Sequence, residues 1–206
     1  MFPIEIPAGT TVESLFTKLA VDLHEQYVTE SAKDEQIAAV KLEGGPTYTY
    51  RVRGRELIVD EGEPKSAPLW MVTKVETVER FLEDWTGPKK YYPRFTPPPG
   101  ALVMMTDPRV MRRLAMVSGR VELALLDFEG ERISITVGCG DAAKKGIDTF
   151  EPDVVIEAKM ATFDKLLAGK LAPEDALADG DVVQRGKKLV AMQLALALAA
   201  FYPAKR

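Results

Sequence analysis

One stretch of the chain matches a motif with known chemistry. Gly138-Cys139-Gly140-Asp141-Ala142-Ala143 follows the apolar run Ile133–Val137 and has the form G-x-G-x-x-A. In dinucleotide-binding folds such glycines let backbone amides approach a pyrophosphate at the start of a long helix. Here Gly146 interrupts the segment after about one helical turn, and Pro152 precedes the next strand-forming run. We therefore predict a flexible loop at the end of a hairpin, with no cofactor.

Two other side chains could do chemistry, but the sequence supplies no partner for either. Cys139 is the only cysteine and His24 the only histidine, and a cysteine nucleophile needs an adjacent base. His24 follows Leu23 near the polar edge of an expected helix, where we predict a solvated surface histidine. The chain has no G-x-S-x-G motif and no cluster with metal-ligand spacing. We expect no catalytic residue, no metal site and no cofactor.

The composition narrows the class of protein. The chain has 206 residues and a net charge of −4, and nucleic-acid binding would favour a strongly basic face. The start, MFPIEIPAGTT, has no basic segment followed by an apolar run, so we expect no secretory or transit signal. A single cysteine cannot form an internal disulfide and fits a reducing compartment. We expect a cytoplasmic protein that binds no nucleic acid.

The N-terminal part reads as a helix followed by strands. Thr10 and Glu13 have the spacing of a capping box, and apolar residues continue at helical spacing to Tyr27. Alternating residues then predict antiparallel strands with one covered side. The expected strands are Ile37–Leu42, Thr47–Arg53, Glu56–Asp60 and Leu69–Thr73, and a helix from Thr73 to Gly87 follows the last of them.

A proline-rich segment, Pro88–Gly100, is the clearest boundary. Its prolines favour extended conformation and disfavour a helix interior, so we predict a semi-rigid connector. The expected organisation is an N-terminal module at 1–92, a connector at 93–106 and a C-terminal domain at 107–206. Within this segment Lys89, Lys90, Tyr91 and Tyr92 also suit a transient membrane contact.

The C-terminal part alternates strands and helices. Asp107 and Pro108 are typical of a helix start, and a hairpin turns at Gly130. Further along we expect a strand at Asp153–Met160, a helix closed by Gly169, a turn of helix after Pro173, a short strand at Asp181–Arg185 and a long apolar helix from Gly186 to Tyr202.

The closing helix is apolar on nearly every side. Its apolar residues fall into two rows, which are Leu189, Met192, Leu196 and Ala199, and Val190, Leu194, Leu198 and Phe201. Such a helix is expected to be buried on more than one face, and its apolar run is shorter than the roughly 20 residues that span a bilayer. It is either a central core helix or a helix with one face on a sheet and another on a lipid-like ligand.

This order of elements resembles the sterol carrier protein type-2 family over residues 107–202. The resemblance rests on Thr162 to Gly169, Pro173 with its acidic turn, Gly180 and Gly186, and upstream on Gly119-Arg120-Val121. Lys187 departs from the pattern, because members commonly have an acidic residue there. A weaker repeat is suggested in the first half, where Phe81 to Gly87 has the spacing of Phe163 to Gly169 and hairpin turns at Gly54 and Gly130 precede both.

The resemblance implies an α+β fold with a mainly antiparallel sheet covered on one face by helices, and two related modules packed together. The first module would be truncated and would need cover from elsewhere. The implied function is non-catalytic binding or transfer of a sterol, fatty acyl chain or isoprenoid between the sheet and the terminal helices. The implied ligand-binding residues are Val121, Leu123, Ile133, Ile135, Phe163 and Leu167, closed by Leu189, Met192 and Leu196.

A second function from another class stays open. The family's module is also similar to accessory domains of lipid-metabolising enzymes, so the chain could be a scaffold that has no ligand of its own. Its partner would then be another protein or a second copy of the chain.

Overall fold

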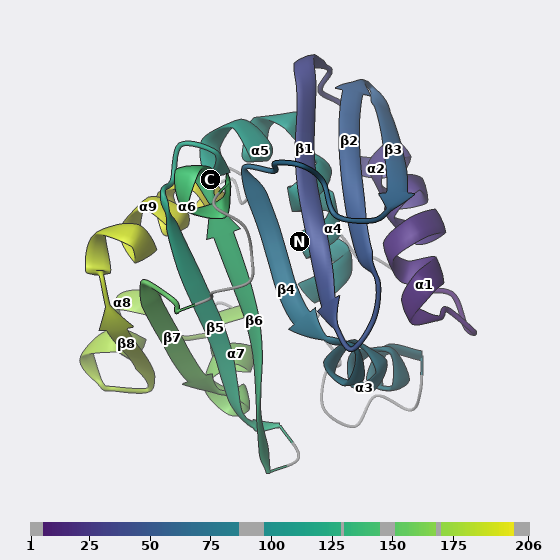
Figure 1. Ribbon diagram of the computed structural model, residues 1–206. Helices are drawn as coiled ribbons and strands as arrows, with labels where there is room; N and C mark the ends of the chain where they lie inside the picture. The colour runs from purple at the N-terminus through teal and green to yellow at the C-terminus, as the bar shows by residue number, and fades with distance from the viewer. Residues whose placement is uncertain (1–5, 87–96, 129, 145–150, 168–169, 200–206) are drawn as a thin grey trace.

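A computed structural model describes residues 6–86, 97–128, 130–144, 151–167 and 170–199. Its eight strands form one sheet in the order β3-β2-β1-β4-β6-β5-β7-β8 (Figure 1). Five of the seven strand pairings are antiparallel, and two, β1 with β4 and β5 with β7, are parallel. The predicted α+β fold with a mainly antiparallel sheet is confirmed.

The elements follow one another in two halves, residues 6–106 and residues 107–199. The N-terminal half contains α1 (Val12–Ser14), the π-helical turn η1 (Leu15–Leu19), α2 (Ala20–Tyr27), β1 (Ala32–Glu43), β2 (Thr47–Gly54), β3 (Glu56–Glu61), β4 (Leu69–Lys74), α3 (Val75–Thr86) and α4 (Pro97–Thr106). The C-terminal half contains α5 (Pro108–Leu114), β5 (Gly119–Phe128), β6 (Glu131–Cys139), α6 (Gly140–Lys144), β7 (Val154–Lys159), α7 (Met160–Leu167), α8 (Pro173–Ala178), β8 (Val182–Gly186) and α9 (Lys188–Ala199).

The two halves are joined within the sheet. Strand β4 pairs with β6 in a ladder from Leu69 opposite Cys139 to Val72 opposite Thr136. In each half a hairpin is extended by a parallel strand that leads into a helix, giving β2-β1-β4 with α3 and β6-β5-β7 with α7. Both expected hairpin turns are present, at Gly54 between β2 and β3 and at Gly130 between β5 and β6. By its place in the sheet, however, the hairpin that corresponds to β5–β6 is β1–β2. That the halves are two related modules stays a prediction.

Each half supplies a strand that the other lacks. In this comparison β2 corresponds to β6, β1 to β5 and β4 to β7. In the N-terminal half β3 pairs with the outer side of β2, and the equivalent place beside β6 is taken by β4. In the C-terminal half β8 pairs with the outer side of β7, and the equivalent place beside β4 is taken by β6. The shared ladder thus completes both halves of the sheet.

Most of the core lies on one face of the sheet. Alternate strand residues such as Val40, Tyr48, Met71, Val121 and Val154 face the helices and belong to one large apolar cluster. Helices α2, α4, α5 and α7 lie behind the sheet in Figure 1. A smaller cluster of Ala39, Ala67, Trp70 and Ala143 packs separately from it. Because neighbouring residues of a strand point to opposite faces, Trp70 and Ala39 place this second cluster on the other side, under α6.

The second part of the expected connector is helical. Pro97 begins α4, and the three prolines occupy its first turn, where a missing backbone N–H costs little. Leu102, Val103 and Met105 are at most 5% exposed and join the main core beside α2. The prediction of an extended segment over Pro88–Gly100 is therefore wrong at residues 97–100, and the expected connector at 93–106 is helical from residue 97 onward. Residues 87–96 lie outside the described residues.

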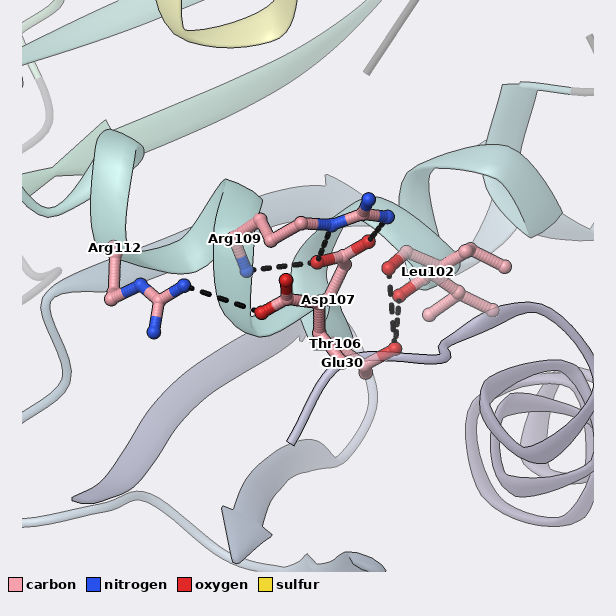
Figure 2. A network of polar contacts seen from close by, with 7 residues as sticks. Glu30, Leu102, Thr106, Asp107, Arg109 and Arg112 are labelled. Carbon is pink, nitrogen blue, oxygen red and sulfur yellow. Dashed lines mark hydrogen bonds and ion pairs between the residues drawn. The ribbon is translucent and has the colours of Figure 1, made fainter. Parts of the chain in front are cut away.

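A polar network fixes the turn from α4 into α5 (Figure 2). Thr106 Oγ1 donates to two backbone carbonyls of α4, and Asp107 caps α5 by accepting from the backbone N–H of Arg109 at 2.8 Å. The guanidinium of Arg109 donates to the same carboxylate at 2.7 Å. Arg112 forms an ion pair of 3.5 Å with Glu30, which precedes β1. The predicted cap at Asp107 is confirmed, and the network ties the boundary between the halves to the N-terminal half.

The first helix differs from its prediction in two details. Its N-cap is Thr11, which forms a capping box with Ser14 in place of the expected Thr10 and Glu13. His24 is only 1% exposed, so the expected solvated histidine is wrong. Neither ring nitrogen has a well-aligned hydrogen bond in the described part of the chain, although backbone groups of Arg55 and Thr106 lie near enough to oppose part of the effect of burial. Burial lowers the pKa of His24 below its ordinary value.

His24 should make stability depend on pH. Because the folded state disfavours the charged imidazole, the unfolded state binds more protons below the ordinary pKa of about 6.5. The contribution of neutral His24 to the free energy of unfolding is therefore fully present above that pH and should be lost as the pH falls below it. We expect the urea midpoint to decrease between pH 7 and pH 5, and His24→Leu to reduce that decrease. An identical pH dependence in the variant would contradict this account.

Candidate functional site

Helix α9 packs closely on the sheet through one of its two apolar rows. Val190, Leu194 and Ala197 are each 6% exposed. A Cβ built at Gly119 on β5 would lie 2.4 Å from Cγ1 of Val190, so the glycine makes room for the helix. The side of α9 that carries Val190 and Leu194 therefore faces the sheet.

Asp153 fixes the start of α9. Its carboxylate accepts from Lys187 Nζ at 2.6 Å and from the backbone N–H of Arg120 at 2.9 Å, and its carbonyl accepts from the backbone N–H of Lys187 at 2.8 Å. The ammonium of Lys187 is the main reason that the pKa of Asp153 is lowered. Lys187, the residue that departs from the expected pattern, thus has a structural role of its own here.

The other apolar row of α9 is exposed. Leu189, Met192 and Leu196 are 66%, 61% and 70% exposed. A central core helix would have buried both rows, so that interpretation is wrong for the described part of α9. The three residues expected to close a cavity lie on the surface, and in this structure they enclose none.

A strip of the helix-facing side of the sheet is only partly covered. Leu123 on β5 points to this side, in register with Ile135 on β6 and Ile156 on β7. Leu123 is 39% exposed, and the other two are half-buried. We call Ile135, Leu123 and Ile156 the open strip. Phe163 on α7 is also half-buried, and like Ile135 and Ile156 it packs against the main core cluster.

The remaining predicted residues of the site have different environments. Val121 is fully buried and Ile133 is 7% exposed, so both belong to the packed core beside the open strip. The side chain of Leu167 lies outside the described part of the structure. The fold therefore brings the sheet residues and Phe163 to one face, and places the α9 row away from the sheet.

Exposed apolar side chains are concentrated in the C-terminal half. The large hydrophobic residues that the described structure leaves exposed are Met116, Leu123, Leu177, Val183, Leu189, Met192 and Leu196. In the N-terminal half the equivalent face of the sheet is closed by Phe16, Tyr48 and Tyr50, each at most 1% exposed. The sheet of the N-terminal half is therefore covered, by the helices before β1 and by α4, which follows the expected module at 1–92. The partly covered face, which carries the open strip, belongs to the C-terminal half.

The glycine motif has a packing role. Gly138 and Cys139 end β6, and α6 begins at Gly140 and is five residues long. Gly140 donates its backbone N–H to the carbonyl of Pro68 at 2.8 Å. It has a φ of +62°, and a Cβ there would lie 2.3 Å from the carbonyl oxygen of Val117. The expected flexible loop is therefore wrong over residues 138–144.

Replacing Gly140 should destabilise the protein. Gly140→Ala forces a side chain into a positive φ and against a backbone oxygen, and we expect a loss of at least about 2 kcal/mol in the free energy of unfolding. Gly180→Ala is the matched control, because Gly180 has a φ of +76° with nothing within 4 Å of its Cβ position. Urea denaturation measures both. Equal losses in the two variants would show that the close contact at Gly140 is unimportant.

The thiol of Cys139 is not placed to act as a nucleophile. Cys139 is fully buried, and burial raises the pKa of its thiol to about 12, so the thiolate is scarce at neutral pH. In the described part of the chain, no three His, Cys, Asp or Glu side chains are grouped to hold a metal ion. The open strip, by contrast, has the apolar character of a binding surface.

The open strip lies within a segment that resembles a known family. Residues 102–199 match the model of the SCP-2 sterol transfer family, and we call these residues the SCP-2 segment. The match supports lipid binding or transfer in general. None of the curated proteins matches the chain.

Solved structures that resemble the chain include several sterol carrier proteins. Sterol carrier protein 2 from Yarrowia lipolytica, in its apo form, is 16% identical with a TM-score of 0.32, and the match covers 43% of this chain and 71% of that one. Sterol carrier protein domain 2 of Helicoverpa armigera is 18% identical with a TM-score of 0.38, covering 70% and 97%. A possible sterol carrier protein from Thermus thermophilus is 26% identical with a TM-score of 0.31, covering 41% and 66%.

Some features of the site were not predicted from the sequence. Ile156 completes the open strip, and its place in the alternating run of Val154–Lys159 could have indicated it. The contact between Asp153 and Lys187 joins residues distant in the chain, and no local pattern marks it.

No helix among the described residues is both long and apolar enough to cross a bilayer.

Proposed function

We propose that the SCP-2 segment is a non-catalytic, cytoplasmic carrier that binds one lipid molecule on the open strip. The observation that carries this proposal is the 39% exposure of Leu123 on the face of the sheet that the helices cover. A residue at such a position is ordinarily packed, as Val121 is on the same strand. Sterols, fatty acyl chains and isoprenoids all present the apolar surface that would cover Leu123.

The ligand would lie between α7 and α9. The proposed contacts from the sheet and α7 are Val121, Leu123, Ile133, Ile135, Phe163 and Leu167. The proposed contacts from α9 are Leu189, Met192 and Leu196, which a ligand would have to cover from outside or after a shift of the helix. Methionine suits such a contact because its unbranched thioether adapts to different shapes.

The expected affinity suits a carrier. A ligand that buries about 400 Å² of apolar surface gains about 10 kcal/mol before losses. Association costs roughly 4–15 kcal/mol, so the net free energy of binding ranges from none to about 6 kcal/mol, which corresponds to a Kd of some tens of micromolar at best. A lipid held this weakly is released readily, which transfer requires.

The exposed row of α9 also favours a second candidate function. Leu189, Met192 and Leu196 expose more than half of their surface each, and contiguous exposed apolar surface is typical of interaction sites. The protein would then be a scaffold for a lipid-metabolising enzyme or would pair with a second copy of itself. A transient membrane contact would use the same kind of surface.

Filling the open strip separates the two functions. In a carrier, Leu123→Trp should weaken uptake of the fluorescent fatty acid cis-parinaric acid at least about tenfold, because the ring occupies the site of the ligand. Its melting temperature should change little, since Leu123 is partly exposed. Leu177→Trp on α8 is the matched control and should bind as the parent does. If the parent binds no fatty acid and Met192→Glu abolishes self-association or capture of a partner, the scaffold function replaces the carrier.

A further inference from the structure

The open strip ends at a polar side chain. Gln184 on β8 pairs in register with Ile156, which pairs with Leu123, which pairs with Ile135. Directly paired residues of neighbouring strands point to the same face of a sheet. The four side chains therefore form one row across β6, β5, β7 and β8, apolar along three strands and amide at the edge strand.

The amide of Gln184 has an unused donor. Its Nε2 is covered from solvent and has no hydrogen-bond partner in the described part of the chain. A side-chain amide nitrogen carries two donor hydrogens, and a buried donor without an acceptor is unfavourable. The charged neighbours of Gln184 on the chain are engaged elsewhere, because Arg185 pairs with Glu157 at 3.2 Å and Lys187 with Asp153.

We propose that Gln184 is the polar anchor of the lipid site and that it selects amphiphiles with a hydrogen-bond acceptor at one end. This inference rests on the proposed carrier function. A hydroxyl or carboxylate oxygen of the lipid accepts from Gln184 Nε2 once the ligand has displaced the side chains that cover it. The apolar body of the lipid then runs over Ile156 and Leu123 toward Ile135.

The position of β8 in the sheet sets the orientation of the bound lipid. Strand β8 is an edge of the sheet, whereas β6 lies in its interior next to β4. An amphiphile held by Gln184 keeps its polar end near the rim and its apolar end over the middle of the sheet. A pure hydrocarbon covers the same strip but leaves the amide without a partner, so it binds less well than an alcohol or acid of equal size.

The proposal is tested with one probe that has a polar end and one that has none. Gln184→Leu keeps a similar volume and removes the donor. We expect it to weaken binding of cis-parinaric acid about tenfold and to leave binding of the hydrocarbon diphenylhexatriene within about twofold. Gln26→Leu, the same change at an exposed position of α2 outside the SCP-2 segment, should alter neither.

A second substitution tests the hydrogen bond itself. Gln184→Glu places an acceptor where the donor was, so it should repel the fatty acid while still accepting from the hydroxyl of the corresponding fatty alcohol. The ratio of alcohol to acid affinity should rise about tenfold or more over the parent. Equal weakening of all probes in both variants, or no change in either, overturns the anchor. Failure of the parent to bind any probe overturns the carrier function instead.

Discussion

A chain cut between residues 87 and 96 should remain a single folded particle. We expect the two fragments from a protease site inserted there to co-elute at the mass of the uncut protein and to separate only in denaturant. The reason is the β4–β6 ladder, together with the core residues Leu102, Val103 and Met105 that α4 places against α2. Without this ladder, β6 would become an open edge with unpaired backbone groups.

Separate expression of the halves is the stricter form of this test. Residues 107–206 alone should be aggregated or poorly folded, and co-expression with residues 1–106 should restore a soluble complex. Size-exclusion chromatography and circular dichroism report both results. Two fragments that are independently soluble, folded and non-interacting would show that the halves are separate domains and that the shared sheet is unimportant for stability.

The second prediction concerns the packing of α9 against β5 and its effect on the free energy of unfolding. In Gly119→Ala the new Cβ meets Val190 at 2.4 Å, and overpacking of this kind costs about 1–3 kcal/mol. Val190→Ala removes the methyl groups that clash, so the double variant should be more stable than the sum of the single effects predicts. Urea denaturation of the parent, the two single variants and the double variant gives the coupling between the two positions.

The coupling between Gly119→Ala and Val190→Ala should be favourable. A favourable interaction energy of about 1 kcal/mol or more in the double variant is expected if α9 sits on Gly119 as described. Gly130→Ala, at a turn where nothing lies within 4 Å of the Cβ position, should show no coupling with Val190→Ala. Simple additivity at Gly119 would mean that α9 is not held against β5.

The strands and most helices follow from local pattern, because alternation and helical spacing are written in neighbouring residues. Helix α4 was missed because its three prolines lie in the one turn that tolerates them. The shared ladder could not be predicted, since no local feature of Leu69–Lys74 or Glu131–Cys139 shows that these two strands pair.

The site was predictable only in part. Alternation placed Leu123 and Ile135 on the apolar face of the hairpin, and the spacing of α9 gave its two rows. A helix that is apolar on both sides does not reveal which row faces the sheet, because that choice depends on Gly119 making room for Val190. Gln184 carried no signal, since its meaning depends on its register with Ile156 and Leu123.

The carrier function requires that the SCP-2 segment holds a lipid. Protein purified under native conditions and extracted with organic solvent should release an amphiphilic lipid by mass spectrometry, in less than one equivalent per chain because a weakly held lipid is partly lost during purification. The delipidated protein should take up cis-parinaric acid. The Leu123→Trp variant, treated identically, should release none. Parent protein that carries no lipid and takes up no fatty acid would contradict the central claim.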